Sequence, residues 1–164
     1  MRVCFFWFAV WPEARRLLAE HAPDAELVYT GPDDLGYWRA ISERWTGERD
    51  LVVIEQDIGI HAGVVPGFAG CGEPWCGFPH IMRPEHPARA KDLGCVRFSA
   101  ELQRRVPMDV IVKHHMNPQC EVCQPDGGGL CWRHIDGPVN AALLSVGLAD
   151  PHEHLPAVEH YHYL

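Results

Sequence analysis

The first 58 residues alternate short strand-like runs with segments of helical periodicity, and this alternation limits the possible folds more than any other feature. Residues 3–8, 26–30 and 51–54 have the length and composition of strands, and the last run is continuously apolar and β-branched. Between them, apolar side chains recur at helical spacing over residues 14–21 and 35–45. A β-α-β-α-β order is typical of parallel strands joined by right-handed crossovers. The sequence therefore predicts an α/β fold with a Rossmann-like, mostly parallel sheet.

Beyond residue 58, segments rich in Gly, Pro, His and Cys interrupt this pattern. We expect a long functional loop or a small irregular layer over residues 59–87, and a second irregular, cysteine-rich insert over residues 114–134. The regular elements expected around these inserts are a strand at 93–98, a helix at 99–105, a brief strand at 110–113 and a helix at 139–146. No repeat or linker divides the chain, so we expect a single domain over residues 1–164.

Charge and hydropathy exclude some classes of protein. The chain carries 14 Lys and Arg against 22 Asp and Glu, a net charge of −8, and it lacks the basic stripe that would bind a nucleic acid. No run reaches the ~18 apolar residues of a membrane span. Residues 1–11 lack a small-residue cleavage site and lead directly into a helix at Pro12, so we interpret them as a buried strand and not as a secretory signal. We therefore expect a cytoplasmic protein whose cysteines are thiols or metal ligands.

The 11 His and 7 Cys indicate metal chemistry, and one group of them has the spacing of a zinc site. The pattern Cys-x2-Cys-x7-Cys-x2-His places four soft ligands around a run of three glycines, and such a loop can wrap one tetrahedral Zn²⁺. Free buried thiols and a disulfide are the alternatives. The four residues are Cys120, Cys123, Cys131 and His134.

The other four cysteines are interpreted separately. Cys4 and Cys95 lie in expected strands and are most simply core residues. Cys71 and Cys76 either pair with each other or contribute to a site, and the sequence does not decide between these.

Glu55-Gln56-Asp57 follows the buried run at 51–54. In open α/β sheets, ligands bind outside the carboxyl ends of the strands. Carboxylates at positions i and i+2 of an extended chain point to the same side, so both can address one ligand. A divalent cation held by such carboxylates commonly binds a diphosphate. The alternative is a polar strand end whose carboxylates bind no ligand.

Asp136 stands at the expected start of the helix at 139–146. Aspartate is a preferred N-cap, and capping alone would explain its presence. The helix dipole at that position also keeps a carboxylate ionised, which suits a general base or a hydroxyl-binding group.

The chain ends with His160-Tyr161-His162, in which an extended backbone would place both imidazoles on one face. Such a tail can fold back and complete a metal site. The alternative is a solvated terminus.

Taken in chain order, these motifs resemble the GT-A family of nucleotide-sugar glycosyltransferases. Glu55-Gln56-Asp57 is similar to the acid-x-acid motif with which that family holds Mn²⁺ and the donor diphosphate. Residues 93–102 resemble the strand and short helix that frame the acceptor side, and residues 132–136 resemble the element that carries the catalytic base. His160 or His162 matches the C-terminal histidine that joins the metal.

The resemblance implies a GT-A-type sheet in which residues 1–58 form the nucleotide-binding half and residues 59–164 the acceptor and metal half. It implies that Glu55 and Asp57 bind the nucleotide-sugar donor and that Asp136 is the catalytic base. The implied metal ligands for Mn²⁺ or Mg²⁺ are Asp57, His160 and His162.

Two functions from different classes follow. The first is a metal-dependent glycosyltransferase that moves a sugar from a nucleotide-diphosphate donor to an acceptor hydroxyl on a glycan, a protein or a small molecule. The second is a zinc-stabilised binding module without catalysis, in which the acidic triplet is incidental. Dependence on added Mn²⁺ or Mg²⁺ supports the first, and tightly bound Zn²⁺ without nucleotide binding supports the second.

Overall fold

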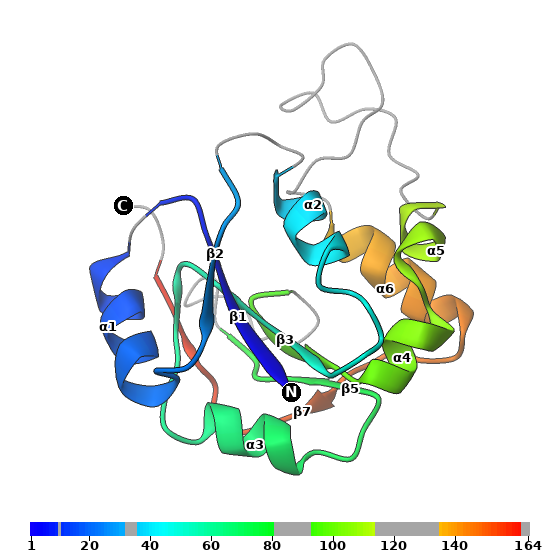
Figure 1. Ribbon diagram of the computed structural model, residues 1–164. Coiled ribbons are helices and arrows are strands. Elements are labelled where there is room, and N and C mark those ends of the chain that lie inside the picture. Colours follow the sequence, from blue (N-terminus) through cyan, green and yellow to red (C-terminus); the bar gives the residue numbers. More distant parts are fainter. Residues whose placement is uncertain (10, 32–35, 81–92, 114–134, 162–164) are drawn as a thin grey trace.

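A six-stranded sheet forms the centre of the computed structural model, which describes residues 1–9, 11–31, 36–80, 93–113 and 135–161 (Figure 1). The strands lie in the order β2-β1-β3-β6-β5-β7. Their bounds are β1 (Arg2–Trp7), β2 (Glu26–Tyr29), β3 (Leu51–Glu55), β5 (Trp75–Gly77), β6 (Cys95–Phe98) and β7 (His152–Glu153).

The sheet is mostly parallel. β1 pairs in parallel with β2 and β3, and β5 pairs in parallel with β7. Only β6, among the strands of this sheet in the described residues, runs in the opposite direction, because it is antiparallel to both β3 and β5. The predicted α/β class, the order of elements over the first 58 residues and the mostly parallel sheet are confirmed.

Helices cover both faces of the sheet, so β3 is buried on each side. Leu51 and Val53 face one core cluster, whereas Val52 and Ile54 face the other. This two-sided burial explains why the run is continuously apolar. α1 (Pro12–His21) and α3 (Val64–Gly70) pack on one face, and the helices on the other face are α2 (Gly36–Ser42), α4 (Ala100–Arg105), α5 (Met108–Lys113) and α6 (Asp136–Ser145).

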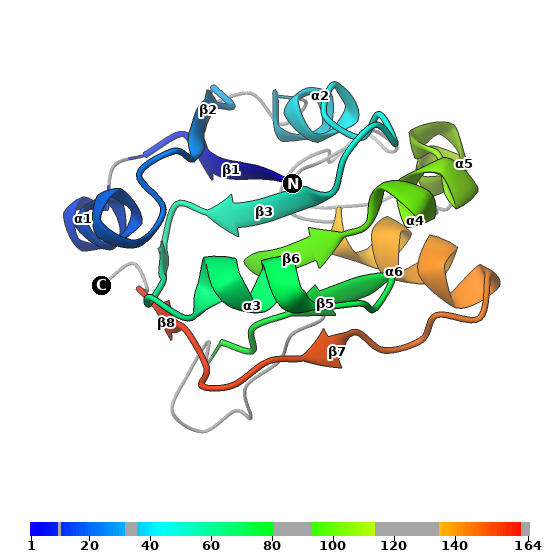
Figure 2. The same ribbon diagram turned by 60° about the horizontal axis from the view of Figure 1, so that its bottom comes forward.

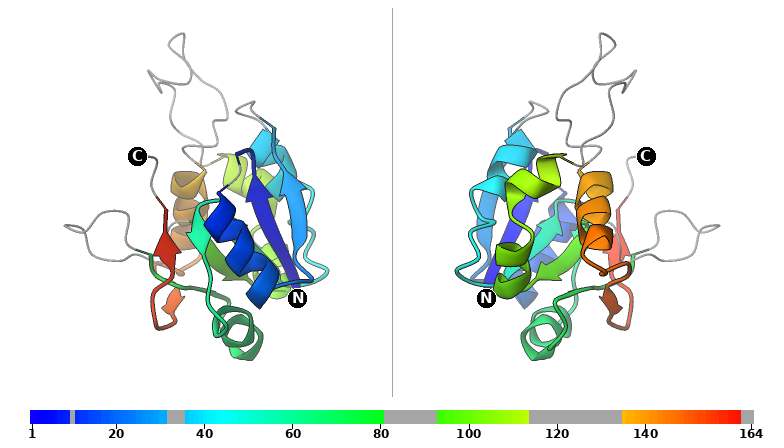
Figure 3. Two further views of the ribbon diagram at one scale, coloured as in Figure 1. Left: turned by 90° about the vertical axis from the view of Figure 1, so that its left-hand side faces the viewer. Right: turned by 90° about the vertical axis from the view of Figure 1, so that its right-hand side faces the viewer.

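The two groups of helices are visible from opposite sides of the molecule. In Figure 3, α1 is nearest the viewer in the left view, and α4 to α6 are nearest in the right view. Inside the second group, the indole of Trp45 donates a hydrogen bond of 2.8 Å to the carbonyl oxygen of Val106 and packs on Phe98.

A second, two-stranded sheet joins the C-terminal segment to the end of β3. β4 (Ile58–Gly59) pairs antiparallel with β8 (Glu159–His160), with Ile58 opposite His160. The chain therefore returns, after about a hundred residues, to the loop that carries the acidic triplet (Figure 2).

Two sequence predictions about the second half are wrong. Residues 110–113 belong to helix α5 and not to a strand, because the Pro107 carbonyl accepts hydrogen bonds from the amides of Val110 and Ile111, and Ile111 is buried in the core. Residues 59–87 contain α3 and β5 and are not wholly irregular. The expected helix that follows β6 is present as α4, and Ser99 caps it, since its side chain accepts a hydrogen bond from the Leu102 amide.

Helix α3 forms although its sequence contains proline and two glycines. Val64 and Phe68, one helical turn apart, are both buried in the core under the sheet. A Cβ atom at Gly67 would lie 2.9 Å from the Phe78 ring, so glycine permits the close approach of helix and sheet. Tertiary packing thus overrides the poor helix propensity of these residues.

The helices of the described residues include none that is long and apolar enough to cross a membrane.

Candidate functional site

Glu55 ends β3 and contacts a buried tyrosine. The hydroxyl of Tyr37, from α2, donates a hydrogen bond of 2.6 Å to Glu55 Oε1. Burial raises the pKa of Tyr37 well above its usual range, and the negative charges of Glu55, Asp136 and Asp57 add to this effect. The phenol therefore stays protonated and donates to the carboxylate. The charges of all three predicted acidic site residues therefore act on this one side chain.

Asp57 lies beside the returning C-terminal segment. The distance from its Oδ2 to His160 Nε2 is 3.5 Å, and the two side chains are 19% and 10% exposed. The Tyr161 amide donates a hydrogen bond of 2.8 Å to the Asp57 carbonyl oxygen. A Cβ atom at Gly59 would lie 2.9 Å from the Tyr161 ring, so glycine allows this segment to approach closely. The structure thus brings together two residues that lie about a hundred positions apart.

His80 lies against His160 in this candidate site, and the sequence did not indicate it. Its ring stacks on the His160 ring with centroids 5.1 Å apart and an interplanar angle of 15°, and its side chain is 3% exposed. An isolated parallel bridge between His80 and Val158 fixes the backbone at this point. His80 follows a Gly- and Pro-rich stretch, where no periodicity identifies a buried side chain.

Gln56, between the two acids, has a structural role that the sequence also did not indicate. Its side chain is buried, and its Oε1 accepts hydrogen bonds of 2.9 Å from the amides of Phe8 and Ala9. The amide therefore ties the loop after β1 to the end of β3. A small hollow next to this loop is lined by Trp7, Trp11 and Arg15, among others.

Asp136 does not cap α6, so this sequence prediction is wrong. The N-cap residue is Ile135, Asp136 is the first helical residue, and no side chain makes the capping hydrogen bond. Instead, Asp136 Oδ1 accepts a hydrogen bond of 2.9 Å from the Leu93 amide, which precedes β6. The helix begins one residue earlier than a cap at Asp136 would require, so this carboxylate lies in the first helical turn and contacts the neighbouring loop instead.

The predicted zinc ligands and one predicted tail ligand cannot be placed. Cys120, Cys123, Cys131, His134 and His162 lie outside the described residues.

Both cysteines that the sequence predicts to be core residues are buried. Cys4 and Cys95 are completely buried, which confirms the prediction. Burial, followed by the charge of Glu26, raises the pKa of Cys4 to about 12. Burial likewise raises the pKa of Cys95, so both remain inert thiols at neutral pH.

No protein-family model matches this sequence. No curated protein matches it either. Among solved structures, the chain is similar to A197 from STIV, with 14% identity, a TM-score of 0.50, and coverage of 100% of this chain and 86% of that chain. An active-site mutant of LgtC shows 11% identity and a TM-score of 0.47 over 100% of this chain and 88% of that chain. Galactosyltransferase LgtC in complex with donor and acceptor sugar analogs shows 13% identity and a TM-score of 0.45 over 98% and 87%. The likeness to A197 is one of fold alone.

Proposed function

We propose that this protein is a metal-dependent glycosyltransferase that moves a sugar from a nucleotide-diphosphate donor to an acceptor hydroxyl. The observation that carries the proposal is the pairing of Asp57 with His160 directly after β3. Parallel sheets bind ligands at the carboxyl ends of their strands, and β1, β2 and β3 end at this edge. The motifs resemble those of GT-A enzymes in the same chain order.

The donor atoms at Asp57 and His160 fit a divalent cation such as Mn²⁺. A carboxylate oxygen and an imidazole nitrogen lie 3.5 Å apart. Neighbouring ligands of an octahedral ion with bonds of about 2.1 Å are separated by roughly 3 Å, so a small side-chain rotation would suffice. When bound, the cation supplies positive charge that stabilises the leaving diphosphate.

Glu55 would bind another part of the donor. Glu55 is oriented by Tyr37 and would accept hydrogen bonds from the ribose hydroxyls. Gln56 keeps the loop after β1 next to the acidic residues.

Asp136 would act as the general base that takes the proton from the acceptor hydroxyl as the new C–O bond forms. Its Oδ1 is oriented by the Leu93 amide, and its charge acts on the same tyrosine as the charges of Glu55 and Asp57. It therefore belongs to the same electrostatic environment as the donor-binding acids.

Replacement of Asp136 tests this chemistry directly. In Asp136→Asn, the amide oxygen still accepts from the Leu93 N–H, so the melting temperature should stay within about a degree of wild type. General-base catalysis typically contributes about 10²- to 10⁴-fold, so the release of nucleoside diphosphate from a panel of nucleotide sugars with Mn²⁺ should fall by that factor. Asp109→Asn, which removes one negative charge at an exposed position, is the control. Equal turnover in Asp136→Asn and wild type would remove Asp136 from the mechanism.

The contact between Tyr37 and Glu55 can be tested separately. Tyr37→Phe keeps the ring that packs edge-on against Phe6, with centroids 5.4 Å apart, but removes the hydrogen bond to Glu55. We expect the KM for the donor to rise several-fold with a smaller change in kcat, and a stability loss of about 1 kcal/mol. Tyr29→Phe, on the exposed side of β2, is the control. An unchanged KM for the donor would show that the hydrogen bond from Tyr37 to Glu55 does not contribute to donor binding.

A further inference from the structure

A second cluster of metal-ligand side chains lies at the edge strand β7 of the sheet. Cys71 follows α3, His152 begins β7 and His154 follows β7. One ligand atom from each of these three residues lies within 4.8 Å of the others. We propose that Cys71, His152 and His154 bind one zinc ion. This site shares no residue with the proposed donor site, so each can be tested without the other.

The backbone fixes both histidines relative to the sheet. β7 pairs in parallel with β5, with His152 opposite Cys76, and the His154 amide donates a hydrogen bond of 2.9 Å to the Gly77 carbonyl oxygen. Side chains two residues apart on an extended chain point to the same side. The two imidazoles are therefore presented together toward the end of α3, and their rings lie edge to face with centroids 4.8 Å apart.

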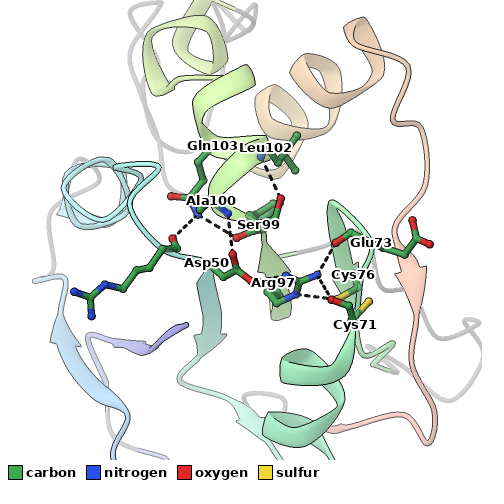
Figure 4. A network of polar contacts seen from close by, with 11 residues as sticks. Asp50, Cys71, Glu73, Cys76, Arg97, Ser99, Ala100, Leu102 and Gln103 are labelled. Atoms are coloured by element: carbon green, nitrogen blue, oxygen red, sulfur yellow. Dashed lines mark hydrogen bonds and ion pairs between the residues drawn. The ribbon is translucent and has the colours of Figure 1, made fainter.

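The segment that carries Cys71 is held by a buried arginine. Arg97 Nη2 donates to the carbonyl oxygens of Cys71 and Glu73, and Arg97 Nε donates to Cys76 Sγ (Figure 4). The positive charge of Arg97 is paired with Asp50 at 2.5 Å. These contacts fix the backbone of the segment that carries Cys71.

The His154 ring is fixed, and one of its nitrogens lacks a partner. The ring stacks on Phe78 with centroids 4.9 Å apart and an angle of 23°, and it contacts the edge of Phe68. Nε2 is buried and has no hydrogen-bond partner among the described residues. A buried polar atom without a partner costs free energy, and coordination to a metal ion would remove that cost.

A sulfur and two imidazole nitrogens are the ligand types of zinc, and they do not suit Mg²⁺ or Ca²⁺. Bonds of about 2.0–2.3 Å place tetrahedral ligands roughly 3.3–3.8 Å apart. The three ligand atoms lie within 4.8 Å of one another, so they would have to move closer together to bind one ion. His152 is exposed and free to rotate inward, whereas His154 is fixed. Three protein ligands leave the fourth tetrahedral position open to solvent on the exposed side.

Zinc bound here would join the end of α3 to β7. These elements are about eighty residues apart in the chain. A metal that binds the folded chain and not the unfolded chain raises the melting temperature. The site should therefore stabilise the attachment of the C-terminal segment to the sheet.

The full-length chain is first treated with a chelator, then given zinc or cobalt and dialysed. Bound zinc is measured by elemental analysis. Bound cobalt is measured by its visible absorption and by its thiolate charge-transfer band. Cys71→Ser and His152→Ala should each lose about one equivalent of metal per chain, together with the zinc-induced rise in melting temperature. His152 is exposed, so its replacement should not impair folding. His21→Ala is the matched control, because His21 lies on α1, away from the cluster.

The cysteine-rich insert is a second potential source of bound zinc, so Cys123→Ser and the double variant Cys71→Ser/Cys123→Ser belong to the same series. The loss caused by Cys71→Ser should be the same in both backgrounds. Equal metal content in wild type, Cys71→Ser and His152→Ala would overturn the proposal. A second result would also overturn it: a Cys71–Cys76 disulfide in a non-reduced peptide map, together with no metal binding at this cluster after the disulfide is reduced.

Discussion

Asp57→Asn should abolish Mn²⁺-dependent binding of a nucleotide sugar and leave the free energy of unfolding nearly unchanged. The diphosphate brings negative charge beside Glu55 and Asp57, so its attraction to the protein must come from the cation. Donor and metal affinities are then coupled in both directions. Because even outer-shell changes at metal sites cost about 10- to 100-fold in affinity, loss of a direct carboxylate ligand should cost roughly 100-fold or more.

Calorimetry of a panel of nucleotide sugars, each with Mn²⁺ or with EDTA, measures this effect. Asp24→Asn makes the same change of charge at an exposed position and should bind like wild type. His160→Ala should weaken metal and donor binding less than Asp57→Asn, because His160 is one of several ligands. Equal donor binding with Mn²⁺ and with EDTA in all variants would contradict the proposed site. Absence of donor binding in wild type, with zinc tightly bound, would favour the zinc-stabilised binding module.

Asp50→Ala should destabilise the fold by about 3 kcal/mol, the largest stability effect that we expect from a single surface-accessible residue. Arg97 is buried with 3% of its side chain exposed, and Asp50 Oδ2 is 2.5 Å from its Nη1. Asp50 Oδ1 also accepts a hydrogen bond of 2.9 Å from the Ala100 amide at the start of α4. Removal of Asp50 would leave a buried positive charge without its counter-ion. The loss is a large part of the roughly 5–15 kcal/mol that stabilises a typical domain.

Urea unfolding at neutral pH measures this difference, with Asp24→Ala as the exposed control. Burial alone would raise the pKa of Asp50, but the hydrogen bond from Ala100 and the contact with Arg97 outweigh burial and lower it below the usual 3.8. The folded-state pKa is thus below the unfolded one, so the ion pair stabilises above the unfolded pKa and this stabilisation is lost as pH falls through the folded pKa. The difference between wild type and Asp50→Ala should therefore shrink below about pH 4. A difference that is constant with pH, or below 1 kcal/mol at neutral pH, would contradict this role.

Local periodicity carries much of the information about this fold. The run from Leu51 to Ile54 is apolar at every position, so its sequence alone indicates a strand covered on both sides. In the structure, neighbouring residues of this run face opposite helical layers. Cys4 and Cys95 were assigned to the core from the same kind of pattern. The position of Glu55 and Asp57 at a strand end follows from where the apolar run stops. These features depend only on residues a few positions apart, so the pattern of apolar and polar residues predicts them.

Short segments of mixed composition behave differently. The run of three apolar residues before Lys113 is too short to distinguish a strand from a helical turn. The hydrogen bonds to the Pro107 carbonyl and the burial of Ile111 select the helix. In α3, contacts of Val64 and Phe68 with the core outweigh the low helix propensity of glycine and proline. Tertiary packing therefore chose the secondary structure where local preference was weak.

Contacts between residues far apart in the chain were decided by the tertiary structure alone. The antiparallel direction of β6, the stacking of His80 on His160 and the hydrogen bond from Leu93 to Asp136 depend on strand pairing and loop closure across many residues. Cys71 meets His152 and His154 only because β7 returns to pair with β5. The sequence by itself determined the order of strands and helices over the first 58 residues and which acidic side chains follow the buried strand β3. The pairing of those strands determined which side chains meet, because a distance between residues tens of positions apart is a property of the folded chain and not of any local pattern.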